Sequence, residues 1–201
     1  MRRPRGVAQV VVIAVLLLAV AIGRYPWPRI AGQAAAPTSG AAGTSTEPTA
    51  SPTDIRAGSL IEATVSRNVD GDTLHVLTSS GATEKVRFIG VNTPESTIEH
   101  EPYGEEASNY TKTRLPVGTR VWLETDVGLR DRYGRLLAYV WLSPPTSRSA
   151  AEVRAKTFNA ELLIQGYAQL TTIPPDIKYV DVFVPLQAAA RDASRGLWGL
   201  P

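Results

Sequence analysis

The chain has 201 residues, of which 43% are hydrophobic and 20% are charged, and this excludes both wholesale disorder and a polytopic membrane protein. The formal net charge is +2, but the positive charge belongs to the N-terminal part. Residues 1–56 hold six of the 21 basic and two of the 19 acidic residues, so residues 57–201 keep 15 basic and 17 acidic residues, a net charge of −2. A bulk positive charge is therefore not how the folded part binds a partner.

The absence of cysteine excludes disulfides, thiolate metal sites and a cysteine nucleophile. The two histidines, His75 and His100, are too few for a multi-histidine metal site, and we interpret both as surface residues. Any metal bound here would have to be a hard cation held by oxygen atoms.

Residues 1–30 have the pattern of an export signal. Three arginines precede an uninterrupted apolar run of 14 residues, Val10 to Gly23, whereas a membrane span needs about 20. Ala19-Val20-Ala21 supplies an A-x-A cleavage signature, but Tyr25 and Trp27 are typical of the interfacial anchors of an uncleaved helix. We therefore expect export, with the protein either secreted or anchored to the outer face of the cytoplasmic membrane.

Residues 31–57 are almost wholly Ala, Thr, Ser, Pro and Gly. Such a segment buries too little apolar surface to offset its chain entropy, and we predict a flexible, disordered linker. The globular domain is expected to occupy residues 58–201.

Within the domain, short β-type runs separated by turn signals predict five strands: Ser59–Val69, Thr73–Leu77, Lys85–Val91, Arg120–Asp126 and Leu136–Leu142. Three helices are predicted: Tyr103–Leu115, Thr157–Gln165 and Val180–Ser194. Since Pro185 is tolerated only near a first turn, the last helix is expected to start a few residues later than Val180. The count and order predict an α+β, mainly β fold, a five-stranded OB-type barrel decorated with three helices.

Two loops between predicted strands carry oxygen ligands. Asp70-Gly71-Asp72-Thr73 has the composition of a hairpin turn, and its two carboxylates could also present oxygen to a hard cation. The strand containing Arg87 leads into Asn92-Thr93-Pro94-Glu95, which offers an amide oxygen, a carbonyl and a carboxylate. A lone arginine in such a strand is usually a surface residue, so neither loop identifies a site by itself.

A third segment, Arg130 to Tyr139, places three arginines and a tyrosine within six residues, directly before a hydrophobic strand. A run of this kind is usually a solvated connection between strands. Guanidinium groups also bind phosphate oxygens through two parallel donors, a geometry that lysine cannot supply.

Taken together, the three segments resemble the staphylococcal nuclease family. The resemblance is carried by Asp-Gly-Asp-Thr, then Arg-x-x-Gly-Val-Asn-Thr-Pro-Glu, then Asp-x-Tyr-Gly-Arg-x-Leu-Ala-Tyr, in that order and at the family's intervals. It extends from about Ser59 to Trp198. The resemblance implies an OB barrel with three helices and calcium-dependent hydrolysis of the phosphodiester bonds of DNA and RNA.

The resemblance also implies roles for particular residues. Arg87, Glu95 and Arg135 fall on the family's catalytic residues, with Glu95 as general base. Arg132 and Tyr133 fall on positions that contact the terminal phosphate of the substrate.

Calcium ligation is implied for Asp72, Asn92 and the backbone carbonyl of Thr93, with Asp70 as a carboxylate that acts through water. Asn92 departs from the second carboxylate of the family's type enzyme, and we expect weaker calcium binding without substrate. Two further departures are an acidic loop, Ser96–Pro102, where the type enzyme is lysine-rich, and the lack of aromatic residues in Thr171–Pro175. The acidic loop predicts weaker association with polyanions, and without the aromatic residues the family's base preference does not carry over to this chain.

We therefore expect an exported nuclease that uses Ca²⁺, has DNA and RNA as substrates and is monomeric, with a membrane contact only if the leader is retained. One alternative is a non-catalytic binding module of the same fold, although the Arg87, Glu95 and Arg135 set is intact. A calcium-stabilised surface protein would explain Asp72 and Asn92 but not the two arginines.

Overall fold

The structure is a computed structural model that describes residues 55–97 and 100–200. The predicted leader, residues 1–30, and most of the predicted linker, residues 31–57, lie outside the described residues, so those predictions stay predictions. Within the described residues, no helix has the length and apolar character needed to cross a membrane.

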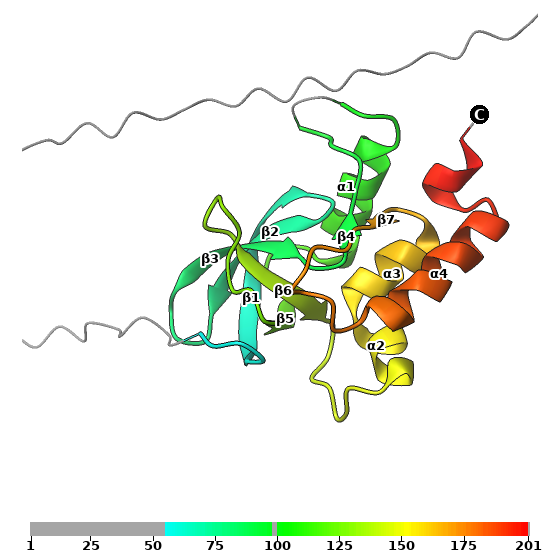
Figure 1. Ribbon diagram of the computed structural model, residues 1–201. Coiled ribbons are helices and arrows are strands. Elements are labelled where there is room, and N and C mark those ends of the chain that lie inside the picture. Colours follow the sequence, from blue (N-terminus) through cyan, green and yellow to red (C-terminus); the bar gives the residue numbers. More distant parts are fainter. Residues whose placement is uncertain (1–54, 98–99, 201) are drawn as a thin grey trace, which may run out of the picture. The chain divides into compact units, whose positions relative to one another are not determined.

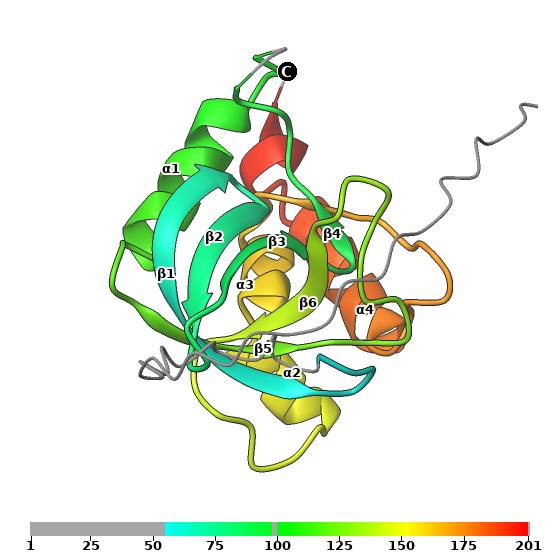
Figure 2. The same ribbon diagram turned by 90° about the vertical axis from the view of Figure 1, so that its left-hand side faces the viewer.

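Five strands form a closed barrel in the order β1-β2-β3-β6-β5, which confirms the predicted fold (Figures 1 and 2). The strands are β1 Leu60–Asp70, β2 Thr73–Thr78, β3 Thr83–Phe88, β5 Arg120–Glu124 and β6 Leu136–Trp141. All neighbouring pairs are antiparallel except β3 and β6, which run parallel. Alternate residues such as Leu74, Val76 and Val86 are fully buried inside the barrel.

The predicted strand Lys85–Val91 is divided in the structure. β3 ends at Phe88, and the chain turns at Gly90, which has a φ of 78°. A two-residue strand, β4 (Val91–Asn92), then pairs with β7 (Gln169–Leu170) in a separate small sheet. The turn was missed because Ile89-Gly90-Val91 continues the apolar pattern of the strand, and only glycine readily adopts this φ.

The described residues contain four α-helices, which are α1 Gly104–Arg114, α2 Ala150–Lys156, α3 Phe158–Gln165 and α4 Val180–Asp192, followed by a 3₁₀ turn, Gly196–Gly199. Helix α2 is an addition to the three predicted helices. Its signal is Ser149, whose side chain accepts a hydrogen bond from the Glu152 backbone N–H, at the spacing of a capping box. Thr157 then ends α2 and caps α3, and α2, α3 and α4 pack beside the barrel (Figure 1).

Helix α4 begins at Val180, so the later start expected from Pro185 is wrong. Pro185 lies inside the helix, just beyond its first turn. Phe183 and Leu186 are buried on either side of it. Their burial against the core stabilises this part of the helix and outweighs the hydrogen bond that proline removes.

Candidate active site

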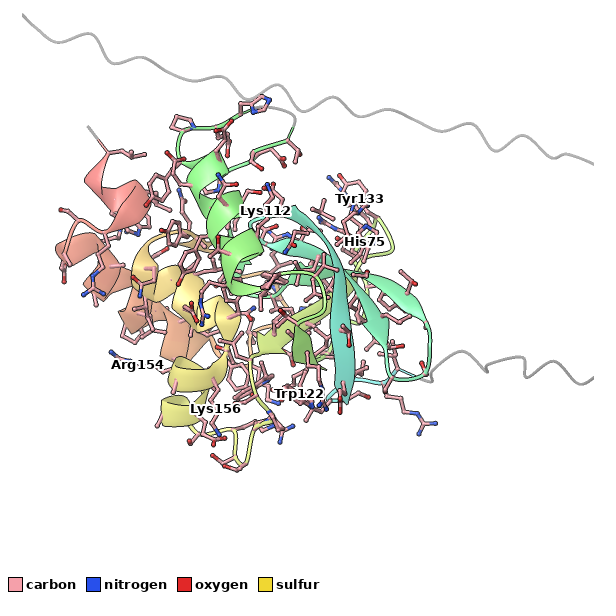
Figure 3. The ribbon with its side chains drawn as sticks, turned by 180° about the vertical axis from the view of Figure 1, so that it is seen from behind. His75, Lys112, Trp122, Tyr133, Arg154 and Lys156 are labelled. Atoms are coloured by element: carbon pink, nitrogen blue, oxygen red, sulfur yellow. The ribbon has the colours of Figure 1, made fainter. Side chains whose placement is uncertain are left out.

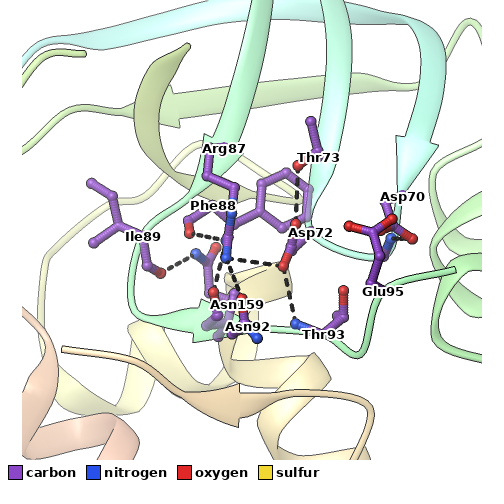
Figure 4. Close-up of polar contacts among 12 residues, drawn as sticks. Asp70, Asp72, Thr73, Arg87, Phe88, Ile89, Asn92, Thr93, Glu95 and Asn159 are labelled. Atoms are coloured by element: carbon purple, nitrogen blue, oxygen red, sulfur yellow. Dashed lines mark hydrogen bonds and ion pairs between the residues drawn. The ribbon is translucent and has the colours of Figure 1, made fainter. Parts of the chain in front are cut away.

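The sequence-predicted catalytic and metal-binding residues lie around one pocket of about 430 Å³. It is lined by Asp70, Asp72, Arg87, Asn92, Thr93, Glu95 and Arg135, together with Val69, Thr73, Lys85, Thr97 and Glu101. These residues come from the β1–β2 turn and from β3 and the loop that follows it (Figure 4), and Arg135 comes from the loop before β6. The barrel thus joins segments that are far apart in the sequence.

The β1–β2 turn is fixed by contacts from two other segments. The Thr111 hydroxyl, which is fully buried in α1, donates to the Gly71 carbonyl at 2.7 Å. A Cβ atom on Gly71 would come within 2.7 Å of the Thr93 hydroxyl oxygen, so only glycine allows this close approach. Sequence reasoning missed Thr111 because its partner lies 40 positions away.

Asp72 is the most firmly held carboxylate of the pocket, with 6% of the residue exposed. Its Oδ2 accepts a hydrogen bond from the Thr93 backbone N–H at 3.0 Å and forms an ion pair with Arg87 at 3.1 Å. Its Oδ1 accepts from the Thr73 hydroxyl at 3.0 Å. These contacts hold the Asp72 carboxylate in one orientation toward the pocket.

Asp70 lies beside Asp72 in a less favourable environment. Burial raises the pKa of Asp70 above its ordinary value, and the charges of Glu95 and Asp72 raise it further, whereas hydrogen bonds from Ser96 and Gly71 act in the opposite direction. The Ser96 hydroxyl donates to Asp70 Oδ1 at 2.6 Å. The pocket therefore has an excess of negative charge at this end, which a cation would relieve.

The Arg87 guanidinium points into the pocket, although a surface position was the usual expectation for it. Its Nη1 donates to the carbonyls of Phe88 and Val91 at 2.8 and 2.7 Å, and its Nη2 donates to Asn92 Oδ1 at 2.9 Å (Figure 4). Burial lowers the pKa of Arg87, and the nearby Arg135 lowers it further, although Asp72 acts against both. The two arginines are therefore close enough to act on one anion.

Asn159 supports Arg87 from the far side of the β3–β4 turn. It is fully buried in α3, where its Nδ2 donates to the Ile89 carbonyl at 2.8 Å and its Oδ1 accepts from the Val140 N–H at 2.8 Å. The turn that carries the carbonyl partners of Arg87 is thereby tied to β6 and α3. Asn159 belongs to the family resemblance, but its supporting role was not predicted, because a lone asparagine in a helix has no evident partner in the sequence.

Glu95 lies at the rim of the pocket. Its Oε1 accepts hydrogen bonds from the backbone N–H of Thr97, at 3.0 Å, and from the hydroxyl of the same residue. A Cβ atom on Gly104, the first residue of α1, would come within 2.5 Å of the Glu95 carbonyl oxygen. The absence of a side chain at Gly104 therefore lets α1 approach the loop that carries Glu95.

Arg135 is held by its own loop. Asp131 accepts from the Arg135 Nε at 2.6 Å and from the backbone N–H groups of Tyr133 and Arg135 at 2.9 and 3.0 Å. Burial alone would raise the pKa of Asp131, but these hydrogen bonds outweigh it and lower that pKa. The charged carboxylate therefore orients Arg135 toward the pocket.

The three arginines of this loop line one neighbouring pocket but have different interaction partners. Arg130 forms an ion pair with Glu84 at 2.7 Å, whereas the guanidinium carbons of Arg132 and Arg135 lie 4.7 and 5.4 Å from the centre of the Tyr133 ring. Arg132 and Tyr133 line a neighbouring pocket of about 570 Å³, which shares Arg87 and Arg135 with the first. One side of this pocket is formed by Ile173, Pro174 and Pro175, which belong to the segment Thr171–Pro175 that lacks aromatic residues.

The donors present fit a hard cation. They are oxygen atoms only, and the hydroxyl of Thr93 is buried with no hydrogen-bond partner. Within the described ranges, no three His, Cys, Asp or Glu side chains are grouped so that they could hold one metal ion. Asn92 Oδ1 already accepts a hydrogen bond from Arg87, so a metal ion would share this oxygen and would need carbonyl or water oxygens besides the nearby carboxylates of Asp72 and Asp70.

Comparison with known proteins agrees with this geometry. Residues 85–199 match the family model described as staphylococcal nuclease homologue. The chain is 38% identical over 151 residues to a thermonuclease of Staphylococcus intermedius, covering 74% of this chain and 80% of that protein. It is 36% identical over 137 residues to a thermonuclease of Staphylococcus hyicus (67% and 73% covered), and 35% identical over 144 residues to endonuclease YncB of Bacillus subtilis (69% and 62% covered).

The family model covers more than half of the chain, and it includes Arg87, Glu95 and Arg135. The two thermonucleases extend the similarity over most of the described domain. The barrel, the pocket and the sequence similarity agree, and the chain belongs to the staphylococcal nuclease family.

Proposed function

We propose that this protein is an exported, calcium-dependent nuclease that hydrolyses the phosphodiester bonds of DNA and RNA. Nuclease activity is supported by the relatives named thermonuclease and endonuclease. The observation that carries the proposal is the meeting of Arg87, Glu95 and Arg135 with Asp72 and Thr93 in one pocket. A non-catalytic module would have no need for two arginines and a glutamate converging beside a carboxylate.

The two arginines supply the electrostatic part of catalysis. Attack on a phosphodiester builds negative charge on the equatorial oxygens, and preorganised donors that meet this charge lower the barrier. Arg87 is held by backbone carbonyls and Arg135 by Asp131, so neither must reorganise as the charge develops. Glu95 accepts the proton of the attacking water and orients that water.

Calcium would be held by Asp72, the Thr93 carbonyl and Asn92, with Asp70 acting through water. When bound, Ca²⁺ would supply a positive charge to a phosphate oxygen and an attachment for water. Asp72 and Asp70 contribute the negative charge that favours its entry.

The test is digestion of DNA and RNA by the full-length protein with calcium or with chelator. We expect cleavage only with calcium, and a fall of about 10²–10⁴ in rate for Glu95→Ala. Glu106→Ala, an exposed glutamate of α1, is the matched control and should retain the wild-type rate. Wild-type protein that cleaves nothing, or Glu95→Ala that cleaves fully, would contradict the proposal.

Export is tested separately, because its signal lies in residues 1–30. Cell fractionation should find the protein outside the cytoplasm. N-terminal sequencing then distinguishes the two forms, since a cleaved protein would begin after Ala21 and an anchored one would keep its leader in the membrane fraction. Recovery of the protein only from the cytoplasm would contradict export.

A further inference from the structure

Three side chains on the outer face of the barrel form a row across β1, β2 and β3. Arg67 is the cross-strand partner of His75, and His75 is the partner of Lys85. Directly opposite residues of neighbouring strands point to the same face, so the three side chains lie side by side. Arg67 and Lys85 are exposed, and His75 is half-buried on the outside of the barrel (Figure 3). We call these residues the cationic row.

Among the described residues, the cationic row has no acidic partner. In the part of the chain that the structure describes, neither Arg67 nor Lys85 forms an ion pair with a carboxylate. The Arg67 guanidinium instead lies 2.8 Å from His75 Nε2. Burial lowers the pKa of His75, and the charges of Arg67 and Lys85 lower it further. Arg67 and Lys85 lie on either side of His75, and a bound anion would compensate their two charges.

The cationic row is adjacent to the candidate active site. Asp70 pairs with Thr73 and Thr73 pairs with Arg87, so these residues form the parallel row across the same three strands. Along β2 and β3 the two rows are two residues apart, or about 7 Å. Lys85 also lines the pocket that contains Arg87 and Arg135. A nucleic-acid strand that extends from this pocket along the row would therefore meet Lys85 first.

The dimensions of the cationic row fit a polynucleotide backbone. Arg67 and Lys85 are two strand spacings apart, about 10 Å, which is the rise of roughly three stacked nucleotides. A β-bulge between Val65 and Arg67 breaks the regular alternation of β1, so that Ser66 and Arg67 are both exposed in succession. The row thus provides two long cationic side chains and one imidazole along a single line.

We infer that Arg67, His75 and Lys85 bind the backbone phosphates of the nucleotides that flank the scissile bond. This inference rests on the proposed nuclease function, because it makes the polynucleotide the ligand. It also offers a way for a domain of net charge −2 to hold a polyanion, since Lys85 lines the pocket and Arg67 lies in the same row beside it.

The test compares two double variants of the full-length protein, Arg67→Ala/Lys85→Ala and Arg154→Ala/Arg191→Ala. Both remove two exposed positive charges, but the second pair lies on α2 and α4 and lines neither pocket of the site. The affinity for a long, labelled single-stranded DNA is measured by fluorescence anisotropy with chelator, so that no cleavage occurs. Equal melting temperatures establish that both variants are folded.

We expect roughly tenfold weaker binding for the row variant, and a dependence of log Kd on log salt that is shallower by about 1.4, or about 0.7 for each lost contact. With calcium, its kcat/KM for the long DNA should fall, whereas that of the Arg154→Ala/Arg191→Ala variant should stay at the wild-type value. Equal effects in the two double variants, or no effect in either, would overturn the inference. If binding depends on the row but no substrate is cleaved, the nuclease function fails while the phosphate-binding row stands.

Discussion

The carboxylates of the candidate active site and the buried carboxylate of Glu124 have opposite electrostatic environments. Glu124 is 1% exposed. It accepts hydrogen bonds from Lys178, Tyr179, Trp141 and Arg148 at 2.5, 2.9, 2.7 and 3.2 Å. Burial alone would raise the pKa of Glu124, but the hydrogen bonds together outweigh it and lower that pKa.

Asp70, by contrast, has its pKa raised by burial and by two neighbouring carboxylates. The negative charge of Glu124 is compensated by Lys178 and Arg148 of the same chain. Its hydrogen bonds join β5, β6 and the segment before α4. Asp72 has one cationic partner, Arg87, whereas Asp70 forms no ion pair among the described residues, and this excess of negative charge leaves room for a cation. The difference separates a carboxylate that stabilises the fold from carboxylates that are prepared for a ligand.

The largest expected effect is on stability at Glu124. Glu124→Ala should lower the free energy of unfolding by about 3–5 kcal/mol, because Lys178 and three other donors would lose their shared acceptor. Glu62→Ala, which removes a surface ion pair with Arg120, should cost less than about 1 kcal/mol. Urea denaturation measures both, and equal costs would remove the distinction between the two environments.

Nuclease activity, in contrast, should depend on the residues of the candidate active site. Arg135→Ala is expected to lower kcat/KM by about 10²–10³, because a preorganised donor to the developing charge is lost. Arg120→Ala on β5 is the control and should leave kcat/KM unchanged. The measurement is initial rates on DNA with calcium. A stability loss in Arg135→Ala as large as that of Glu124→Ala would show that the two regions are not separate.

The pH dependence of stability should reflect Glu124. Because its pKa in the folded state is lowered, its contribution to stability is present above its ordinary pKa and is lost as the pH falls through the folded-state value. Glu124→Gln should therefore have a flatter acid limb in the free energy of unfolding than wild type. Urea midpoints over a series of acidic pH values, with chelator, measure this, and parallel curves would contradict it.

The smallest expected effect concerns calcium. Asn92→Asp adds a carboxylate near the ion, which for a divalent cation at about 4 Å in water gives about 2 kcal/mol. Since Arg87 already binds the side chain at this position, part of the gain should be lost, and we expect roughly tenfold tighter calcium binding by calorimetry. An unchanged affinity would mean that residue 92 serves Arg87 and not the metal.

Sequence reasoning predicted the elements of the fold well where the signal was local. Short β-type runs between turn signals indicated the barrel strands, and Pro116 and Gly118 marked the end of the first helix. It missed the turn at Gly90 and helix α2, although Ser149 and Glu152 carried a capping signal. It assigned no role to Arg130, because the spacing of the arginines in the 130–135 loop does not reveal that Glu84 binds Arg130.

By itself, the sequence determined the class of fold, the order of the motifs and the residues from which the candidate site is built. These features depend on local periodicity, turn chemistry and residue type, all of which are readable over a few positions. Only the tertiary structure decided which carboxylates are paired and which are left for a ligand. That depends on strand register and on contacts across the barrel, such as Thr111 on Gly71, Asn159 behind Arg87 and Arg67 opposite His75. Such contacts join distant segments, and no local pattern specifies them.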